Sequence, residues 1–163
     1  AWLEARDLLP LLERQEGSDV HAVSGSWRYH RFVGRPLVVP PEEGGAWVKA
    51  YHGTWWYALS SLLTSGVVAE SADESSGHEF WAVGAYCSPL VETARQYARP
   101  QRVFSDGMYH RVMLEVMYDP RRLRKYRERG GVQLVLPSEA ISITGVLFQP
   151  NAPPERGEER LES

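Results

Sequence analysis

The sequence has a single cysteine, Cys87, among its 163 residues. One cysteine excludes an internal disulfide framework and a zinc site built from cysteines, and it fits an intracellular setting. No apolar run is long enough to span a membrane, and the N-terminal residues do not resemble a signal peptide. The formal net charge of −3 gives no overall attraction to nucleic acid. We therefore expect an intracellular protein that has no membrane partner.

The five histidines are also too scattered to indicate a metal site. His21 and His30, for example, lack the pairwise spacing that metal-binding histidines show, so no metal is predicted. The length suits one domain with one core, which we expect to be monomeric. The chain begins with Ala1 rather than methionine, so we expect an excised domain or a processed product.

A strand-to-helix corner at His52-Gly53-Thr54 organises the rest of the chain. Aromatic and β-branched residues predict a strand over 46–51, and helical spacing predicts a helix from Trp55 that ends at Gly66. Thr54 is expected to cap this helix, and Gly53 is expected to leave its backbone open to a ligand. Such a corner is a common place to hold a small molecule.

Other patterns predict several strands and a second helix, which we expect over 89–98 with Ser88 as its N-cap. Residues 2–14 are expected to form a helix or two short turns. The remaining predicted strands are 26–33, 80–88, 108–118, 132–137 and 140–148. Because strands are not regularly interleaved with long helices, we predict an α+β fold with mainly antiparallel sheets.

The chain divides into three predicted parts. Residues 1–45 form an N-terminal extension of a helix and a strand that packs on the core, 46–149 form the core, and 150–163 form a disordered tail. The basic run 121–129 indicates a solvated helix or loop. The alternative for this run is a contact for phosphate or an acidic partner.

Three motifs in order resemble the NAD-binding core of the ADP-ribosyltransferases, in the branch related to diphtheria toxin and the poly(ADP-ribose) polymerases. They are His52-Gly53-Thr54, then Gly84-Ala85-Tyr86, then a helix that carries Ala94 and Tyr97. The resemblance covers 49–148. It implies a split pair of mainly antiparallel sheets with a few short helices, and NAD as the substrate.

The resemblance also implies roles for the matching residues. His52 would hydrogen-bond a ribose hydroxyl of NAD, beside Thr54, and the backbone of Gly53 would hold the nicotinamide carboxamide. Tyr86 and Tyr97 would sandwich the nicotinamide ring between flat aromatic faces. Ala94 occupies the position where the polymerases carry a serine that contacts the carboxamide.

The chain departs from the family at Gln133, where the family has a carboxylate. A glutamine can hydrogen-bond the ribose but cannot offset the positive charge that develops on the sugar as nicotinamide leaves. Losing such a contact costs on the order of 2–4 kcal/mol of transition-state stabilisation. Glu139 would replace the carboxylate only in a different register. Transfer of a single ADP-ribose is therefore expected, because a chain-elongating enzyme would need the glutamate.

Three functions follow as hypotheses. The first is mono-ADP-ribosyl transfer from NAD to a protein, nucleic acid or small acceptor, chosen by the loops 70–79 and 100–107. The second is an inactive module on the same fold that binds a nucleotide, nucleic acid or protein. The third is an RNA 2′-phosphotransferase-like reaction, which needs arginines and histidines around a phosphate, with His78 and His110 as the candidates.

Overall fold

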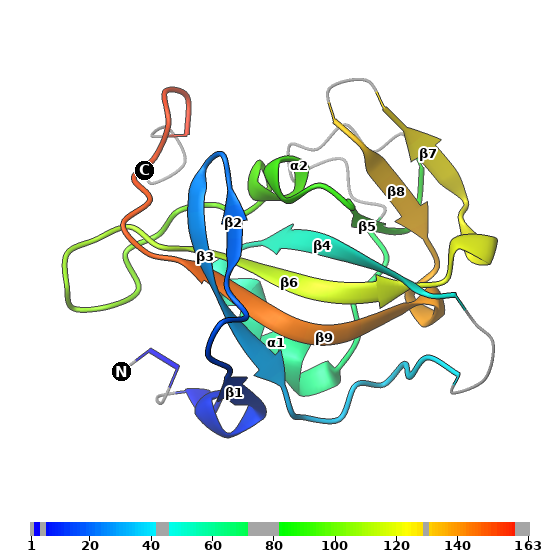
Figure 1. Cartoon of the computed structure of the whole chain (residues 1–163), viewed down its shortest axis with the longest axis horizontal. Coiled ribbons are helices and arrows are strands. Elements are labelled where there is room, and N and C mark those ends of the chain that lie inside the picture. Colours follow the sequence, from blue (N-terminus) through cyan, green and yellow to red (C-terminus); the bar gives the residue numbers. More distant parts are fainter. Residues whose placement is uncertain (1, 4–5, 42–45, 72–81, 129–130, 159–163) are drawn as a thin grey trace.

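The computed structural model describes residues 2–3, 6–41, 46–71, 82–128 and 131–158. The fold is α+β, with a six-stranded and a three-stranded antiparallel sheet and a few short helices (Figure 1). This confirms the predicted fold class. Among the described residues, no helix is long and apolar enough to cross a bilayer.

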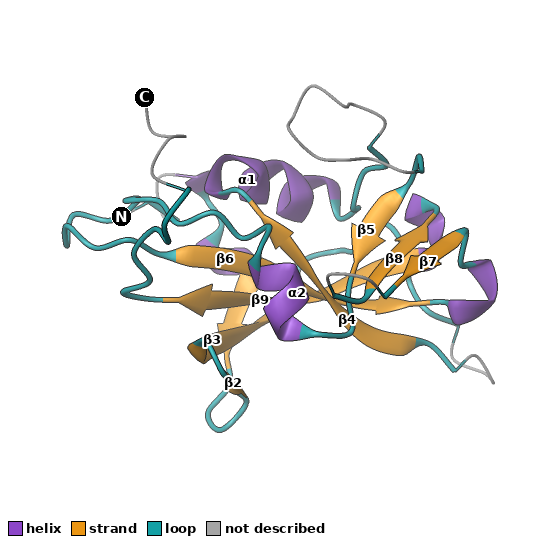
Figure 2. Cartoon of the chain, turned by 90° about the horizontal axis from the view of Figure 1, so that it is seen from above, coloured by secondary structure: helices purple, strands orange, loops and turns teal. Residues whose placement is uncertain are grey.

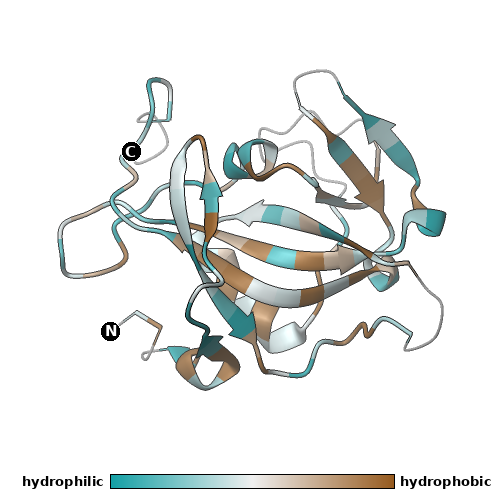
Figure 3. Cartoon of the chain, viewed as in Figure 1, coloured by the Kyte–Doolittle hydropathy of each residue, from teal (hydrophilic) through white to brown (hydrophobic). Residues whose placement is uncertain are grey.

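The large sheet has the strand order β1-β3-β9-β6-β4, and β2 pairs with β3 beside β1. Two of its inner strands, β6 and β9, are buried along almost their whole length, and Figure 3 shows apolar residues concentrated there. A strand covered on both faces is nearly continuous in apolar residues, which is why these two segments were predictable. The strands are β1 (Leu12–Arg14), β2 (Val20–Ala22), β3 (Gly25–Phe32), β4 (Val48–Thr54), β6 (Arg111–Tyr118) and β9 (Ile141–Gln149).

The small sheet has the order β5-β8-β7, formed by Ala85–Cys87, Gln133–Leu136 and Lys125–Arg127 respectively. It joins the large sheet through one antiparallel bridge between Tyr51 and Ser88. The amide of Tyr51 donates to the carbonyl of Ser88 at 2.7 Å, and the amide of Ser88 donates back at 2.9 Å. Figure 2 shows the small sheet at one end of the large one.

Helix α1 (Trp56–Ser65) ends at Gly66, whose left-handed φ of 70° confirms the predicted C-cap. Its predicted N-cap is wrong, because the cap residue is Trp55 and no side chain caps the helix. Helix α2 (Val91–Arg95) is shorter than predicted and begins after Leu90. The 3₁₀ turns in the described residues are η2 (Leu9–Leu11), η4 (Pro120–Arg122) and η5 (Ser138–Ala140).

The two helices cover opposite faces of the large sheet. The buried side of α1, including Trp56 and Leu59, packs in one core with Leu114 of β6. Ala94 of α2 lies in a second core with Met113, whose side chain points to the other face of β6. The start of α1 and the whole of α2 therefore flank the end of β4.

The terminal segments differ from their predictions. Where 2–14 is described, the chain forms the short turn η2, in line with the turn alternative, and then strand β1, which was not predicted and whose backbone pairs with β3. β3 itself pairs with β9, so the N-terminal part adds strands to the large sheet. Residues 150–158 are not disordered: the amide of Ala152 donates to the carbonyl of Tyr109, and Glu158 pairs with Arg111. Residues 159–163 of the predicted tail lie outside the described residues.

Two further segments also differ. The basic run predicted as a solvated helix or loop contributes η4 and strand β7. β7 is at the edge of the small sheet, where charged side chains remain in water. The strand predicted over 80–88 is limited to β5 within its described part, and residues 80 and 81 lie outside the described residues.

Candidate functional site

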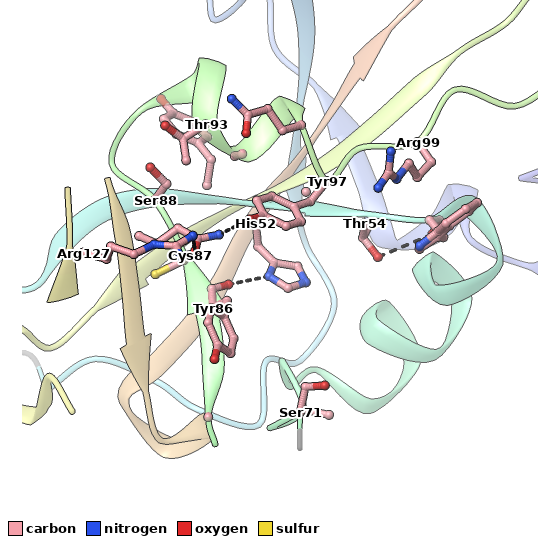
Figure 4. Close-up of a pocket in the computed structure, with 18 of the residues that line it drawn as sticks. His52, Thr54, Ser71, Tyr86, Cys87, Ser88, Thr93, Tyr97, Arg99 and Arg127 are labelled. Atoms are coloured by element: carbon pink, nitrogen blue, oxygen red, sulfur yellow. Dashed lines mark hydrogen bonds between the residues drawn. The ribbon is translucent and has the colours of Figure 1, made fainter. Parts of the chain in front are cut away.

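A cavity of about 520 Å³ lies where the two sheets separate. It is bounded by the end of β4, the start of α1, β5, α2 and the start of β8 (Figure 4). The site residues predicted from the sequence come from β4, β5, β8, α2 and the turn after α2, and every one of them lines the cavity. They are His52, Gly53, Thr54, Tyr86, Ala94, Tyr97 and Gln133.

His52 spans the gap between β4 and β5. Beyond the bridge at Tyr51 and Ser88 the strands are not paired, and the His52 imidazole Nδ1 donates to the carbonyl of Tyr86 at 2.6 Å. Because a carbonyl only accepts, Nδ1 carries the proton and Nε2 of the neutral ring is an acceptor. Burial lowers the pKa of His52 below its ordinary value. The ring is therefore neutral near pH 7, with Nε2 able to accept a hydroxyl proton.

Gly53 is required by the packing of α2, and that its backbone is open to a ligand stays a prediction. A Cβ atom at this position would lie 2.0 Å from the carbonyl oxygen of Ala94 and 2.8 Å from the amide nitrogen of Ala98. No side chain fits there. The buried hydroxyl of Thr54 donates to the carbonyl of Trp55 at 3.4 Å and does not cap α1.

The two predicted tyrosines lie on either side of His52 in the view of Figure 4. The Tyr86 hydroxyl donates to the carbonyl of Ala82 and accepts from its amide at 3.3 Å, which fixes the ring. Burial raises the pKa of Tyr86, so its phenol stays neutral. Tyr97 is half-buried at the end of α2. That these rings sandwich a ligand ring stays a prediction.

Gln133 begins β8 and is only 6% exposed. Its amide nitrogen donates to the Tyr97 hydroxyl at 2.5 Å, and its carbonyl oxygen accepts from Arg127 at 3.0 Å. Arg127 lies directly opposite Gln133 in the β7–β8 pair, which brings the two side chains together. Glu139 is exposed, pairs with Arg122 at 2.9 Å and does not line the cavity, so it does not replace Gln133.

Arg99 and Arg127 are the charged side chains of the lining, and no carboxylate lines the cavity within the described part of the chain. The Arg99 guanidinium lies 5.8 Å from the centre of the Trp55 ring, and one of its nitrogens lies 3.8 Å from a carboxylate oxygen of Glu158. Figure 4 shows Arg99 and Arg127 toward opposite ends of the cleft. This charge distribution favours an anionic ligand.

Sequence analysis did not name either arginine as a site residue, although a phosphate contact was the alternative for the basic run that contains Arg127. For Arg127 the missing information was the strand β7, because the basic run was interpreted as surface. For Arg99 the missing information was the short length of helix α2, which ends at Arg95 and lets the chain bring Arg99 close to Trp55. No local motif marks either position.

Three consecutive aromatic residues at the start of α1 divide between core and cleft. Trp56 is 1% exposed and stacks on Phe148, with 5.6 Å between ring centres. Trp55 and Tyr57 line the cavity instead, with ring centres 5.7 Å apart, and Tyr57 is 71% exposed. The rim of the cleft near Arg99 therefore presents aromatic faces to solvent.

Other predicted candidates do not reach the cavity. His110 is buried, contacts Asp106 at 2.7 Å and packs on Phe104, so its role is structural. His78 lies outside the described residues, as does most of the loop 70–79, although Ser71 lines the cavity. No residue of the loop 100–107 lines it.

No protein-family model matches this chain, and no curated protein sequence matches it.

Proposed function

We propose that this cleft binds NAD and that the chain is a mono-ADP-ribosyltransferase. One observation carries the proposal: His52, Tyr86, Tyr97 and Gln133, which are far apart in the sequence, line one cavity. These residues carry the resemblance to the ADP-ribosyltransferases, and the split pair of antiparallel sheets agrees with the fold that it implies.

The cleft offers groups that suit each part of NAD. Nε2 of His52 can accept from a ribose hydroxyl, because Nδ1 already donates to Tyr86. Arg99 can pair with the diphosphate, and Tyr86 and Tyr97 offer aromatic faces to the nicotinamide. The volume of about 520 Å³ is in the usual range of small-molecule sites.

The reaction that follows is cleavage of the nicotinamide–ribose bond and transfer of one ADP-ribose to an acceptor. The neutral Gln133 holds Tyr97 and Arg127 and supplies no negative charge to the sugar. A chain-elongating activity is therefore not part of the proposal. The proposal does include an intracellular site of action, because NAD has to be available as the substrate.

Nicotinamide release from NAD, measured by chromatography, tests the proposed activity. We expect release by the native protein and an approximately hundredfold lower rate for Tyr86→Ala, which removes one face of the ring site. Tyr126→Ala is the matched control, because Tyr126 is exposed on β7 and does not line the cleft. Equal rates for the two variants would contradict the proposal.

A second candidate is a non-catalytic module that binds NAD or another nucleotide. The hydrogen bond between Arg127 and Gln133 favours it, because it places a guanidinium beside the residue that stands where the family has a carboxylate. Saturable NAD binding without nicotinamide release would support this candidate. The RNA 2′-phosphotransferase hypothesis gains two arginines, but His52 is the only histidine in the described lining.

A further inference from the structure

One end of the cleft is an arrangement of hydrogen-bond donors around Arg127. Arg127 donates to Gln133, which in turn donates to the Tyr97 hydroxyl. Two buried hydroxyl groups, of Ser88 and Thr93, line the same end, where Figure 4 shows them above Arg127. This end therefore combines one cation with several neutral donors.

That arrangement disfavours the transfer of ADP-ribose to a neutral acceptor. If NAD binds as proposed, its reactive ribose lies beside Gln133, and positive charge develops there as nicotinamide leaves. The nearby Arg127 guanidinium disfavours this charge, and no carboxylate in the described lining offsets it. Water or a neutral hydroxyl brings no compensating charge.

We propose that the acceptor is a small phosphate monoester, held by Arg127 and by the hydroxyl groups of Ser88 and Thr93. This inference rests on the proposed function. A phosphate monoester has three terminal oxygens, which match one guanidinium and two hydroxyl donors better than the two oxygens of a carboxylate do. In the transition state its negative charge offsets the positive charge on the ribose, which the neutral Gln133 cannot do.

A phosphate acceptor also needs no general base. Within the described lining no carboxylate is present to deprotonate a hydroxyl or an amine. His52 is a weak base, because burial lowers its pKa. A phosphate dianion attacks without losing a proton, so the composition of the cleft is sufficient for it.

The neighbouring surface favours a small acceptor over a nucleic-acid strand. In the described part of the basic segment that leads away from Arg127, the exposed arginines each pair with a carboxylate. Arg121 pairs with Asp119, Arg122 with Glu139, and Arg124 with Glu70. A polyanion would need several unpaired cations along its path.

The step balances without a redox partner. A phosphate oxygen attacks C1 of the nicotinamide ribose and forms a C–O bond. The C–N bond breaks, and its electron pair goes to the ring nitrogen of the cationic nicotinamide, which leaves neutral. The product is a phosphodiester between ADP-ribose and the acceptor.

The test compares nicotinamide release from NAD in water alone, with ribose 5-phosphate and with ribose, and identifies the product by ³¹P NMR. We expect ribose 5-phosphate to raise the rate at least about tenfold and to yield the phosphodiester, whereas ribose has no effect. Arg127→Met abolishes the increase. Arg122→Met, from the same basic segment but outside the cleft, keeps it.

Gln133→Glu provides a second readout, with a result that a misfolded variant would not give. The new carboxylate pairs with Arg127 and faces the sugar, so the rate in water rises while the increase from ribose 5-phosphate falls. If both rates change in the same direction, the inference is wrong. It is also wrong if a 5′-phosphorylated oligonucleotide or a phosphoserine peptide reacts faster than ribose 5-phosphate.

Binding of NAD, measured separately by calorimetry, distinguishes the two levels of the proposal. If NAD does not bind, the proposed function fails, and this inference fails with it. If NAD binds and nicotinamide is released into water with no increase from ribose 5-phosphate, only the inference about the acceptor fails.

Discussion

Gly53 shows how a single side chain would change the packing at this site. In Gly53→Ala the new methyl group would meet the backbone of Ala94 at 2.0 Å, so α2 would have to shift away from β4. We expect a loss of about 1–3 kcal/mol in the free energy of unfolding, measured with urea. NAD binding should weaken as well, because Tyr97 follows α2. An unchanged stability together with unchanged binding would contradict this account of Gly53.

We expect NAD binding to be insensitive to pH in the neutral range, because His52 is neutral there. Burial lowers its pKa, so the ring stays neutral down to a pH below the ordinary histidine value of about 6.5. Protonation at lower pH turns Nε2 from an acceptor into a donor and charges the buried ring, so affinity should then fall. Calorimetric titrations between about pH 8 and pH 5 check this. A fall in affinity that begins above the ordinary histidine pKa would show that the ring is not neutral as described.

The residues of the site were predictable to different degrees. His52, Tyr86 and Tyr97 belong to ordered motifs, and the structure brings them together in one cavity. Arg99 and Arg127 belong to no motif, because each reaches the cleft only through the folded position of α2 or β7. Residue types with local signatures were therefore found, and residues defined by tertiary placement were missed.

Among the elements, α1 was predictable because its apolar spacing and Gly66 agree. Helix α2 was predicted too long: the Ser88 hydroxyl accepts from the amide of Leu90, which keeps the chain extended before the helix starts. Strand β7 is three residues long, and pairing with β8 rather than its own sequence makes it a strand. Short edge elements of this kind leave no periodic signal.

The segment 150–158 was predicted to be disordered from its composition, but its acidic residues find distant partners. Glu158 pairs through two hydrogen bonds, of 3.1 and 2.8 Å, with Arg111, which is fully buried. Glu155 pairs with Arg95 at 2.7 Å. The charges that gave the segment a disordered composition are the groups that attach it to α2 and β6.

Because of this attachment, the free energy of unfolding should decrease at acidic pH. Burial acts to raise the pKa of Glu158, but the hydrogen bond from Arg111, the amide of Glu155 and the nearby charges lower it overall. A lowered pKa means that the carboxylate stabilises the fold at neutral pH, and this contribution is lost as pH falls through the lowered value. Glu158→Gln should therefore cost about 1–3 kcal/mol in the free energy of unfolding at neutral pH.

The same variant should differ less from the native protein at a pH below the lowered pKa of Glu158, where the carboxylate of the native protein is protonated. Urea unfolding at both pH values measures the difference. Glu155→Gln is the matched control, because that side chain is 63% exposed and its pair is worth less. An equal effect of Glu158→Gln at both pH values would mean that its charge does not stabilise the fold.

At the scale of the whole molecule, the site exists because two antiparallel sheets, joined in the described part of the chain by the bridge between Tyr51 and Ser88, then separate. The fold class was predictable from the order of strands and helices. The pairing of β3 with β9, which joins the two ends of the chain, was not, because register between distant strands depends on contacts that no local pattern records. The cleft is a consequence of this topology together with His52, which spans the gap.

The most direct test of the account is a calorimetric titration of the protein with NAD, up to about 1 mM, beside His52→Ala and His21→Ala. His21 is an exposed strand residue that contacts Ser26, so its loss controls for the removal of a histidine. The account predicts saturable binding to the native protein and to His21→Ala, and an affinity at least about tenfold weaker for His52→Ala. Absence of binding to the native protein, or equal affinity in both variants, would contradict it.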